Sequence, residues 1–185
     1  HARIDVLVHA AGLEISRALP DKKPEEFDLI WDVKCDGAHH LLRAIGDMPL
    51  GAMVAFSSIA GRFGNAGQTD YSSANDFLCK LMSGFKSSRP TTRGIAIDWT
   101  AWADIGMASR GSIPQIMAAA GIDMLPPAVG IPIVRRELET NDGASEVVAA
   151  GNLGVMLEDL DEHGGIDPNA FSSRTMPMLG KLTRM

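Results

Sequence analysis

Short apolar runs alternate along the chain with longer segments in which apolar residues recur every three or four positions. The short runs predict buried parallel strands, at residues 4–8, 53–56, 94–97 and 145–150. The periodic segments predict helices, at residues 24–45, 70–85 and 128–139. Strands that alternate with helices indicate parallel βαβ units. The expected fold class is therefore α/β, a Rossmann-like doubly wound parallel sheet.

The remaining segments predict the organisation of the chain. The glycine-rich residues 61–67 predict a loop, and residues 104–127, rich in Gly, Pro and Met, predict a mobile cover. An acidic, glycine-rich stretch after residue 151 is typical of a linker. We therefore expect one domain over residues 1–150, a linker over 151–175 and the start of a following domain at 176–185.

The opening strand, residues 4–8, is expected to be buried, yet no residues precede it that could cover its edge. Because an uncovered apolar edge promotes aggregation, the chain is expected to begin in the middle of a domain whose N-terminal part is missing.

The composition of the chain argues against several classes of binding partner and location. A net charge of -6 argues against nucleic acid or an anionic membrane as the main partner. Two cysteines, Cys35 and Cys79, are too few for a disulfide framework and indicate a reducing, cytoplasmic location. No apolar run approaches the roughly 18 residues that span a membrane. The five histidines show no metal-ligand spacing, and no metal is predicted.

Four polar residues occupy positions in the sequence that could lie together in one site. Ser58 ends a predicted strand, Tyr71 opens a helix, Asn75 follows one turn later, and Lys34 is the only charged residue in the apolar stripe of residues 24–45. Strand ends and helix starts meet at one edge of an α/β sheet, where ligands bind. Donors there could stabilise negative charge developing on a carbonyl oxygen. We expect Ser58 to hold that oxygen, Tyr71 to donate a proton, and Asn75 to position Lys34 or a water.

The Lys34 ammonium is expected to lower the pKa of the Tyr71 phenol, since a nearby positive charge favours the phenolate. Ordinary structural roles remain open for each residue. Ser58 could cap a helix, Tyr71 could bury its ring, Asn75 could be satisfied by backbone, and Lys34 could reach solvent.

Five segments together resemble the short-chain dehydrogenase/reductase superfamily, and more closely the ketoreductase domains of polyketide and polyunsaturated fatty-acid synthases. They are residues 8–12 (VHAAG), 33–38 (VKCDGA), 56–61 (FSSIAG), 67–75 (GQTDYSSAN) and 98–103 (DWTAWA). In ordinary members of the superfamily a lysine lies four residues after the tyrosine and an asparagine on the preceding helix. Here Asn75 and Lys34 show the exchanged arrangement of the synthase domains.

The resemblance implies NADPH-dependent reduction of a β-ketoacyl thioester on an acyl carrier protein, within a multidomain cytoplasmic synthase. It implies that Lys34, Ser58, Tyr71 and Asn75 are catalytic. It also implies that the cofactor is bound by Ala10, Ala11, Gly12, Thr100 and Ala101. Neighbouring synthase domains would be partners.

The chain departs from the family pattern in two ways. No Gly-x-Gly-x-x-Gly occurs, so the phosphate-binding loop is expected in an upstream half, and the isolated chain is expected to be inactive. The choice of NADPH rests on the resemblance alone. Residues 13–16 (LEIS) and Phe63 replace the usual stereochemical markers, which leaves the product configuration open.

Two alternatives remain open: a free-standing short-chain dehydrogenase acting on small alcohols or sugars, and a structural half-domain without catalysis. Within the predicted cover, Met107, Met117 and Met124 could pack against an acyl chain or simply within the core.

Overall fold

The computed structural model describes residues 3–109, 111, 113–140 and 143–156 of the chain. Within these residues lies a four-stranded, fully parallel sheet in the order β1-β2-β3-β4. The strands are β1 (Ile4–His9), β2 (Leu50–Ser58), β3 (Arg93–Trp99) and β4 (Glu146–Ala149). The predicted fold class is confirmed.

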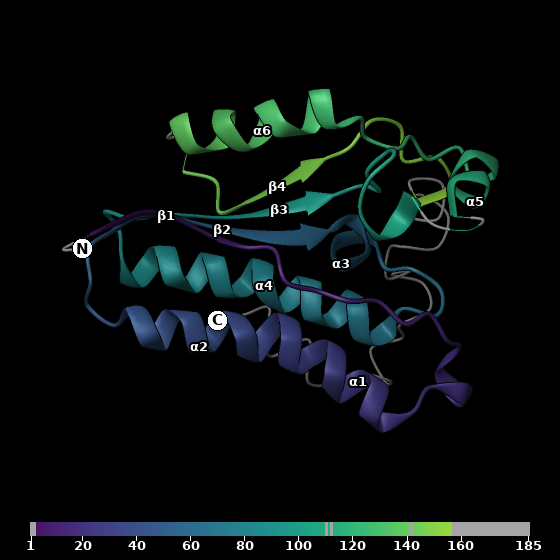
Figure 1. Cartoon of the computed structure of the whole chain (residues 1–185), viewed down its shortest axis with the longest axis horizontal. Helices are drawn as coiled ribbons and strands as arrows, with labels where there is room; N and C mark the ends of the chain where they lie inside the picture. Colours follow the sequence, from purple (N-terminus) through teal and green to yellow (C-terminus); the bar gives the residue numbers. More distant parts are fainter. Residues whose placement is uncertain (1–2, 110, 112, 141–142, 157–185) are drawn as a thin grey trace, which may run out of the picture.

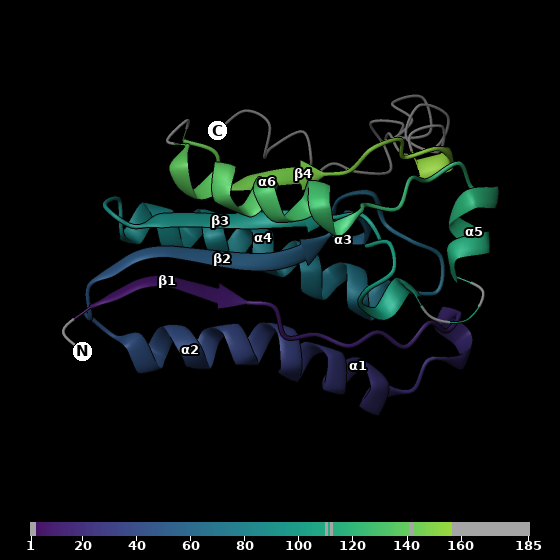
Figure 2. The same ribbon diagram turned by 45° about the horizontal axis from the view of Figure 1, so that its top comes forward.

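Helices cover both faces of the sheet (Figure 1). On one face lie α1 (Pro24–Trp31), α2 (Gly37–Ile45) and α4 (Thr69–Ser88), while α6 (Pro127–Glu139) covers the other. Shorter elements are η1 (Leu19–Asp21), α3 (Ile59–Phe63), η3 (Met107–Ser109) and α5 (Ile113–Ala119). Figure 2 shows α5 beyond the carboxyl ends of the strands, the edge at which the polar motifs were expected to meet.

The core consists of two apolar layers separated by the sheet. Met53 and Ala55 on β2 pack with Leu78 and Met82 of α4. Val54, between them, faces the other layer, which also contains Ile95 and Ile97 of β3 and, partly buried, Ile133 of α6. Because both faces of β2 are covered, the strand is a continuous apolar run without the alternation of a half-exposed strand.

The predicted helix over residues 24–45 contains a π-helical turn, Asp32–Asp36, between α1 and α2. Lys34 and Cys35 are both buried within this turn. The carbonyl oxygen of Lys34 accepts a hydrogen bond from Nε2 of buried His9 at 2.8 Å, which fixes the tautomer of the imidazole. Such single π turns often occur at functional sites.

Two expectations about local structure were wrong. Strand β1 is not fully buried: it lies at the edge of the sheet, and Val6 and Val8 are 43% and 46% exposed, because α6 packs over β2, β3 and β4 but not over β1. The glycine-rich segment predicted as a loop begins inside a helix, since α3 extends to Phe63. The predicted cover of residues 104–127 contains η3 and α5.

The domain boundaries were predicted from composition. Residues 151–156, the first part of the predicted linker, pack on the domain through Leu153, which is buried with Ile59 and Ile122. Residues 157–175 and the predicted following domain, 176–185, lie outside the described residues. Across the part of the chain that the structure describes, no helix has the length and apolarity to cross a membrane.

Candidate active site

Ser58 lies where β2 ends and α3 begins. Its backbone is extended, and its Oγ accepts a hydrogen bond from the backbone N–H of Ala60 at 3.2 Å, so the residue caps α3. The hydroxyl proton is not used in that bond and can be donated to another group. The capping role and the predicted role on a substrate oxygen are therefore compatible in one side chain.

Tyr71 and Asn75 lie one turn apart on α4. The Asn75 side chain is fully buried, and its Nδ2 donates to the backbone carbonyl oxygen of Tyr71 at 2.7 Å. Helix α3 approaches closely at this point: a Cβ placed on Gly61 would lie 2.8 Å from the Cβ of Asn75. The missing side chain of Gly61 thus lets the end of β2 and the start of α4 come together.

Lys34 enters the same region from the π turn. Its Nζ lies 5.5 Å from the ring centroid of Tyr71, over the face of the ring, and donates to the backbone carbonyl oxygen of Phe56 at 3.2 Å. The amine is almost fully buried, and this burial lowers its pKa from 10.5 to about 8. The lysine therefore does not reach solvent.

The expectation that Lys34 lowers the pKa of Tyr71 was wrong for the structure described. Burial is the largest influence and raises the pKa of the phenol above 10. Hydrogen-bonding groups of Ser58 and Asn75 act in the opposite direction but do not reverse the shift. Because the ammonium lies over the face of the ring, its main contact is with the π system. At neutral pH the phenol keeps its proton.

A cavity of about 250 Å³ brings most of the predicted residues together. Lys34, Ser58 and Tyr71 line it, whereas Asn75 lies behind Tyr71 and holds its backbone. Four of the five predicted cofactor-binding residues also line it: Ala10, Gly12, Thr100 and Ala101. Ala11, between two of them, is exposed and does not line the cavity.

Part of the cavity lining, here called the apolar wall, is apolar. Ile105, Met107, Ile113 and Met117 line it, together with Trp102. Two of the three methionines singled out in the sequence therefore face the cavity, while Met124 does not. A cavity lined by apolar side chains together with a few polar ones is typical of a small-molecule site.

Gly12 brings the backbone of the loop after β1 close to Lys34. A Cβ at Gly12 would lie 3.1 Å from Cε and 3.2 Å from Nζ of Lys34, so any larger residue would press on the lysine. The glycine leaves the backbone close to the amine and open to the cavity.

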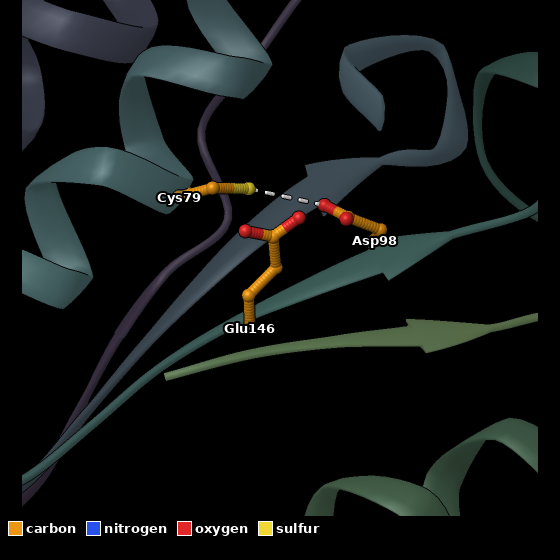
Figure 3. Close-up of side chains that lie close together, drawn as sticks. All are labelled: Cys79, Asp98 and Glu146. Atoms are coloured by element: carbon orange, nitrogen blue, oxygen red, sulfur yellow. Dashed lines mark hydrogen bonds between the residues drawn. The ribbon is translucent and has the colours of Figure 1, made fainter. Parts of the chain in front are cut away.

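A second polar cluster was not anticipated from the sequence. Cys79, Asp98 and Glu146 bring their Sγ and carboxylate oxygens within 4.8 Å of one another (Figure 3). The Sγ of Cys79 lies 3.2 Å from Oδ1 of Asp98 and 3.3 Å from Oγ of Ser57. Burial raises the pKa of the Cys79 thiol to about 12, so the sulfur keeps its proton. The three residues come from α4, β3 and β4, and no spacing in the sequence reveals them.

Burial, aided by the facing Glu146 carboxyl, raises the pKa of Asp98 to about 6. In the unfolded chain this carboxyl is more acidic, so folding favours its protonated form and stability falls as the pH rises from about 4 through 6. We expect Asp98→Asn to raise the free energy of unfolding at pH 8 by on the order of 1–2 kcal/mol, and to change it little at pH 4. Urea denaturation at both pH values measures this. An equal change in the free energy of unfolding at pH 4 and at pH 8 would contradict the raised pKa of Asp98.

Comparison with known proteins gives one family and several relatives. The KR domain family model matches residues 1–104. The polyketide synthase ThaG of Burkholderia thailandensis is 36% identical over 176 residues, covering 92% of this chain. A polyunsaturated fatty acid synthase chain from a Thraustochytrium species is 34% identical over 134 residues, covering 72%. The chain spans only 3% and 5% of these two relatives.

Solved structures show the same fold. An A-type ketoreductase from a modular polyketide synthase superposes with a TM-score of 0.72 at 26% identity, over 79% of this chain and 30% of that one. A short-chain dehydrogenase from Streptomyces avermitilis gives the same TM-score at 19% identity, over 98% of this chain and 71% of that one. The second likeness concerns the fold alone.

Proposed function

Since the chain belongs to the KR domain family, the ketoreductases of polyketide and polyunsaturated fatty-acid synthases, we propose that it takes part in NADPH-dependent reduction of a β-ketoacyl thioester to the β-hydroxyacyl form. The substrate would be carried on an acyl carrier protein within a multidomain synthase. One observation carries the proposal: Lys34, Ser58 and Tyr71 line a single cavity, with the Lys34 amine 5.5 Å from the Tyr71 ring centroid.

The proposed chemistry requires stabilisation of a developing alkoxide. Bound NADPH would supply a hydride to the carbonyl carbon, and the carbonyl π electrons would move onto oxygen. Ser58 would donate a hydrogen bond to that oxygen, and Tyr71 would transfer its phenolic proton to it. The raised pKa of Tyr71 suits this direction, since the group is a proton donor at neutral pH.

Lys34 and Asn75 would support the proton transfer in different ways. The Lys34 ammonium over the ring becomes more favourable as the phenol loses its proton and the ring gains negative charge. Asn75 would position Tyr71 through its hydrogen bond to the backbone carbonyl oxygen of that residue. The second role differs from the predicted one, in which Asn75 positioned the lysine or a water.

The apolar wall formed by Ile105, Met107, Ile113 and Met117 supports an acyl chain as substrate. A carrier-bound thioester and neighbouring synthase domains are proposed from the multidomain relatives. The phosphate-binding loop is proposed to come from an upstream half of the reductase domain, because no Gly-x-Gly-x-x-Gly occurs in this chain. Cys35 and Cys79 are free thiols, which supports a cytoplasmic location.

The test uses the intact synthase polypeptide, a β-ketoacyl thioester and NADPH or NADH. We expect NADPH to be consumed in proportion to β-hydroxyacyl product, with a higher kcat/KM than for NADH. A small ketone or sugar without a thioester should be reduced more slowly, since it leaves the apolar wall uncovered. Equal kcat/KM for the small ketone would favour a free-standing type of dehydrogenase, and no turnover of any carbonyl would favour a structural half-domain.

A further inference from the structure

A buried ion pair joins the loop after β1 to the first turn of α4. The Nζ of Lys22 lies 2.8 and 2.7 Å from the two carboxylate oxygens of Asp70, and 2.5 Å from the carbonyl oxygen of Ile15. All three ammonium protons therefore have acceptors. The two side chains are only 4% and 1% exposed. Moving two charges out of water costs about as much free energy as their mutual attraction provides in the interior. A buried ion pair is therefore weak evidence for a stabilising role.

The pair holds Tyr71 from two sides. Oδ1 of Asp70 accepts a hydrogen bond from the backbone N–H of Tyr71 at 2.9 Å, within the first turn of α4. On the other side, Ile15 packs in the same apolar cluster as the Tyr71 ring, and its carbonyl oxygen is the third acceptor of Lys22. A single ammonium thus connects Asp70, which holds the backbone N–H of Tyr71, with a loop whose Ile15 packs in the same apolar cluster as the Tyr71 ring.

The same loop also places a charged residue near the phenol of Tyr71. Glu14 lines the cavity, and its carboxylate is one of the influences that raise the pKa of Tyr71. Ser16 donates a hydrogen bond to Glu14 and accepts one from Gln68 Nε2 at 3.3 Å. The position of the loop therefore determines where the Glu14 carboxylate lies relative to Tyr71.

We propose that Lys22 and Asp70 are positioning residues, whose ion pair fixes the loop of residues 10–22 against the first turn of α4 and so places Glu14 and Ile15 around the Tyr71 phenol. Neither residue lines the cavity, so both act through Tyr71. The proposal rests on the proposed function of Tyr71 as proton donor. It assigns a role to two residues that lie 48 positions apart and that no motif connects.

The chain offers a direct readout because Tyr71 is its only tyrosine. In this 185-residue chain, tyrosine labelled only at its ring Cζ carbon therefore gives one NMR resonance, whose pH titration reports the pKa of this phenol without any need for turnover. The charged groups that face Tyr71, Lys34 and Glu14, are left unchanged. The test variant combines Lys22→Met with Asp70→Asn, which leaves no unpaired charge buried and still offers an acceptor to the backbone N–H of Tyr71.

We expect the double variant to fold, with a Tyr71 pKa that falls toward the usual value of about 10 as the loop loosens and the phenol becomes more exposed. In the intact synthase, kcat should fall by about 10- to 100-fold, the cost of a small misplacement of a reacting group, while KM for NADPH changes little. The matched control, Lys80→Met with Asp76→Asn, removes an exposed ion pair of 3.1 Å from the same helix and should change neither quantity.

A double variant with the parental Tyr71 titration and the parental kcat would overturn the proposal. A double variant that fails to fold would also overturn it, because the pair would then serve stability. The proposed function fails separately: if Tyr71→Phe keeps full activity, Tyr71 is not the proton donor, whatever the titration of the double variant shows.

Discussion

Replacing Tyr71 with phenylalanine is expected to lower kcat for ketone reduction by about 10²- to 10⁴-fold, the contribution of a positioned proton donor. The substitution removes only the hydroxyl, since the phenylalanine ring would still lie beneath the Lys34 amine. Burial keeps the Tyr71 hydroxyl protonated at neutral pH, so the parent always has a proton to give. Without it, the developing alkoxide loses its proton source.

Steady-state consumption of NADPH by the intact synthase measures the loss, and cofactor binding measured by fluorescence should stay at the parental level. Ser73→Ala is the matched control. Ser73 is an exposed hydroxyl on the same helix, whose Oγ donates only to backbone carbonyl oxygens, including that of Thr69 at 2.8 Å. Parental kcat in Tyr71→Phe would remove the assigned role.

Replacing Lys34 with methionine is expected to make the protein more stable and less active. Burial lowers the pKa of the folded amine to about 8, against about 10.5 in the unfolded chain. The folded state therefore binds this proton less tightly. As the pH falls from about 10.5 to 8, this group destabilises the fold, and below pH 8 its full cost, on the order of 3 kcal/mol, is present. Methionine has a similar length and carries no charge.

We expect Lys34→Met to raise the free energy of unfolding at pH 7 by about 1–3 kcal/mol, and by less at pH 10, where the parent no longer has to bury a charge. Reduction should slow by about 10²-fold, because the ionising phenol loses the cation over its ring. Urea denaturation and NADPH consumption give the two results. Lys80→Met, an exposed lysine on α4, should change neither. Equal activity together with reduced stability at pH 7 would contradict both arguments.

Much of the fold follows from the sequence because apolar runs and periodic stripes report burial directly. All four strands and the three long helices lie where the pattern predicts them, and the sheet is parallel as the alternation requires. The errors have local causes. The apolar run of β1 has the composition of a buried strand, yet whether a strand is covered depends on where α6 lies. Helix α3 was missed because its glycine serves close packing against Asn75, not a turn.

The site was predicted in part. Motif resemblance indicated Lys34, Ser58 and Tyr71, and the structure brings these three to one cavity. The pKa of Tyr71 was predicted in the wrong direction, since a sequence reveals which charges are near but not how deeply a phenol is buried. The Lys22–Asp70 pair and the cluster around Asp98 were missed because their members come from separate elements and meet only after folding.

Because of the π turn at Asp32–Asp36, the position of the Lys34 amine depends on the number of residues in the first long helix. Each added or deleted residue rotates the following part of an α-helix by about a quarter turn or more. Loss of one residue here would convert the π turn to regular α-helix. The Lys34 side chain would then point away from Tyr71, while α1, α2 and the sheet would be retained. Deletion of one of these five residues is therefore expected to slow reduction by removing the Lys34 amine from the Tyr71 ring, even where the sheet is retained.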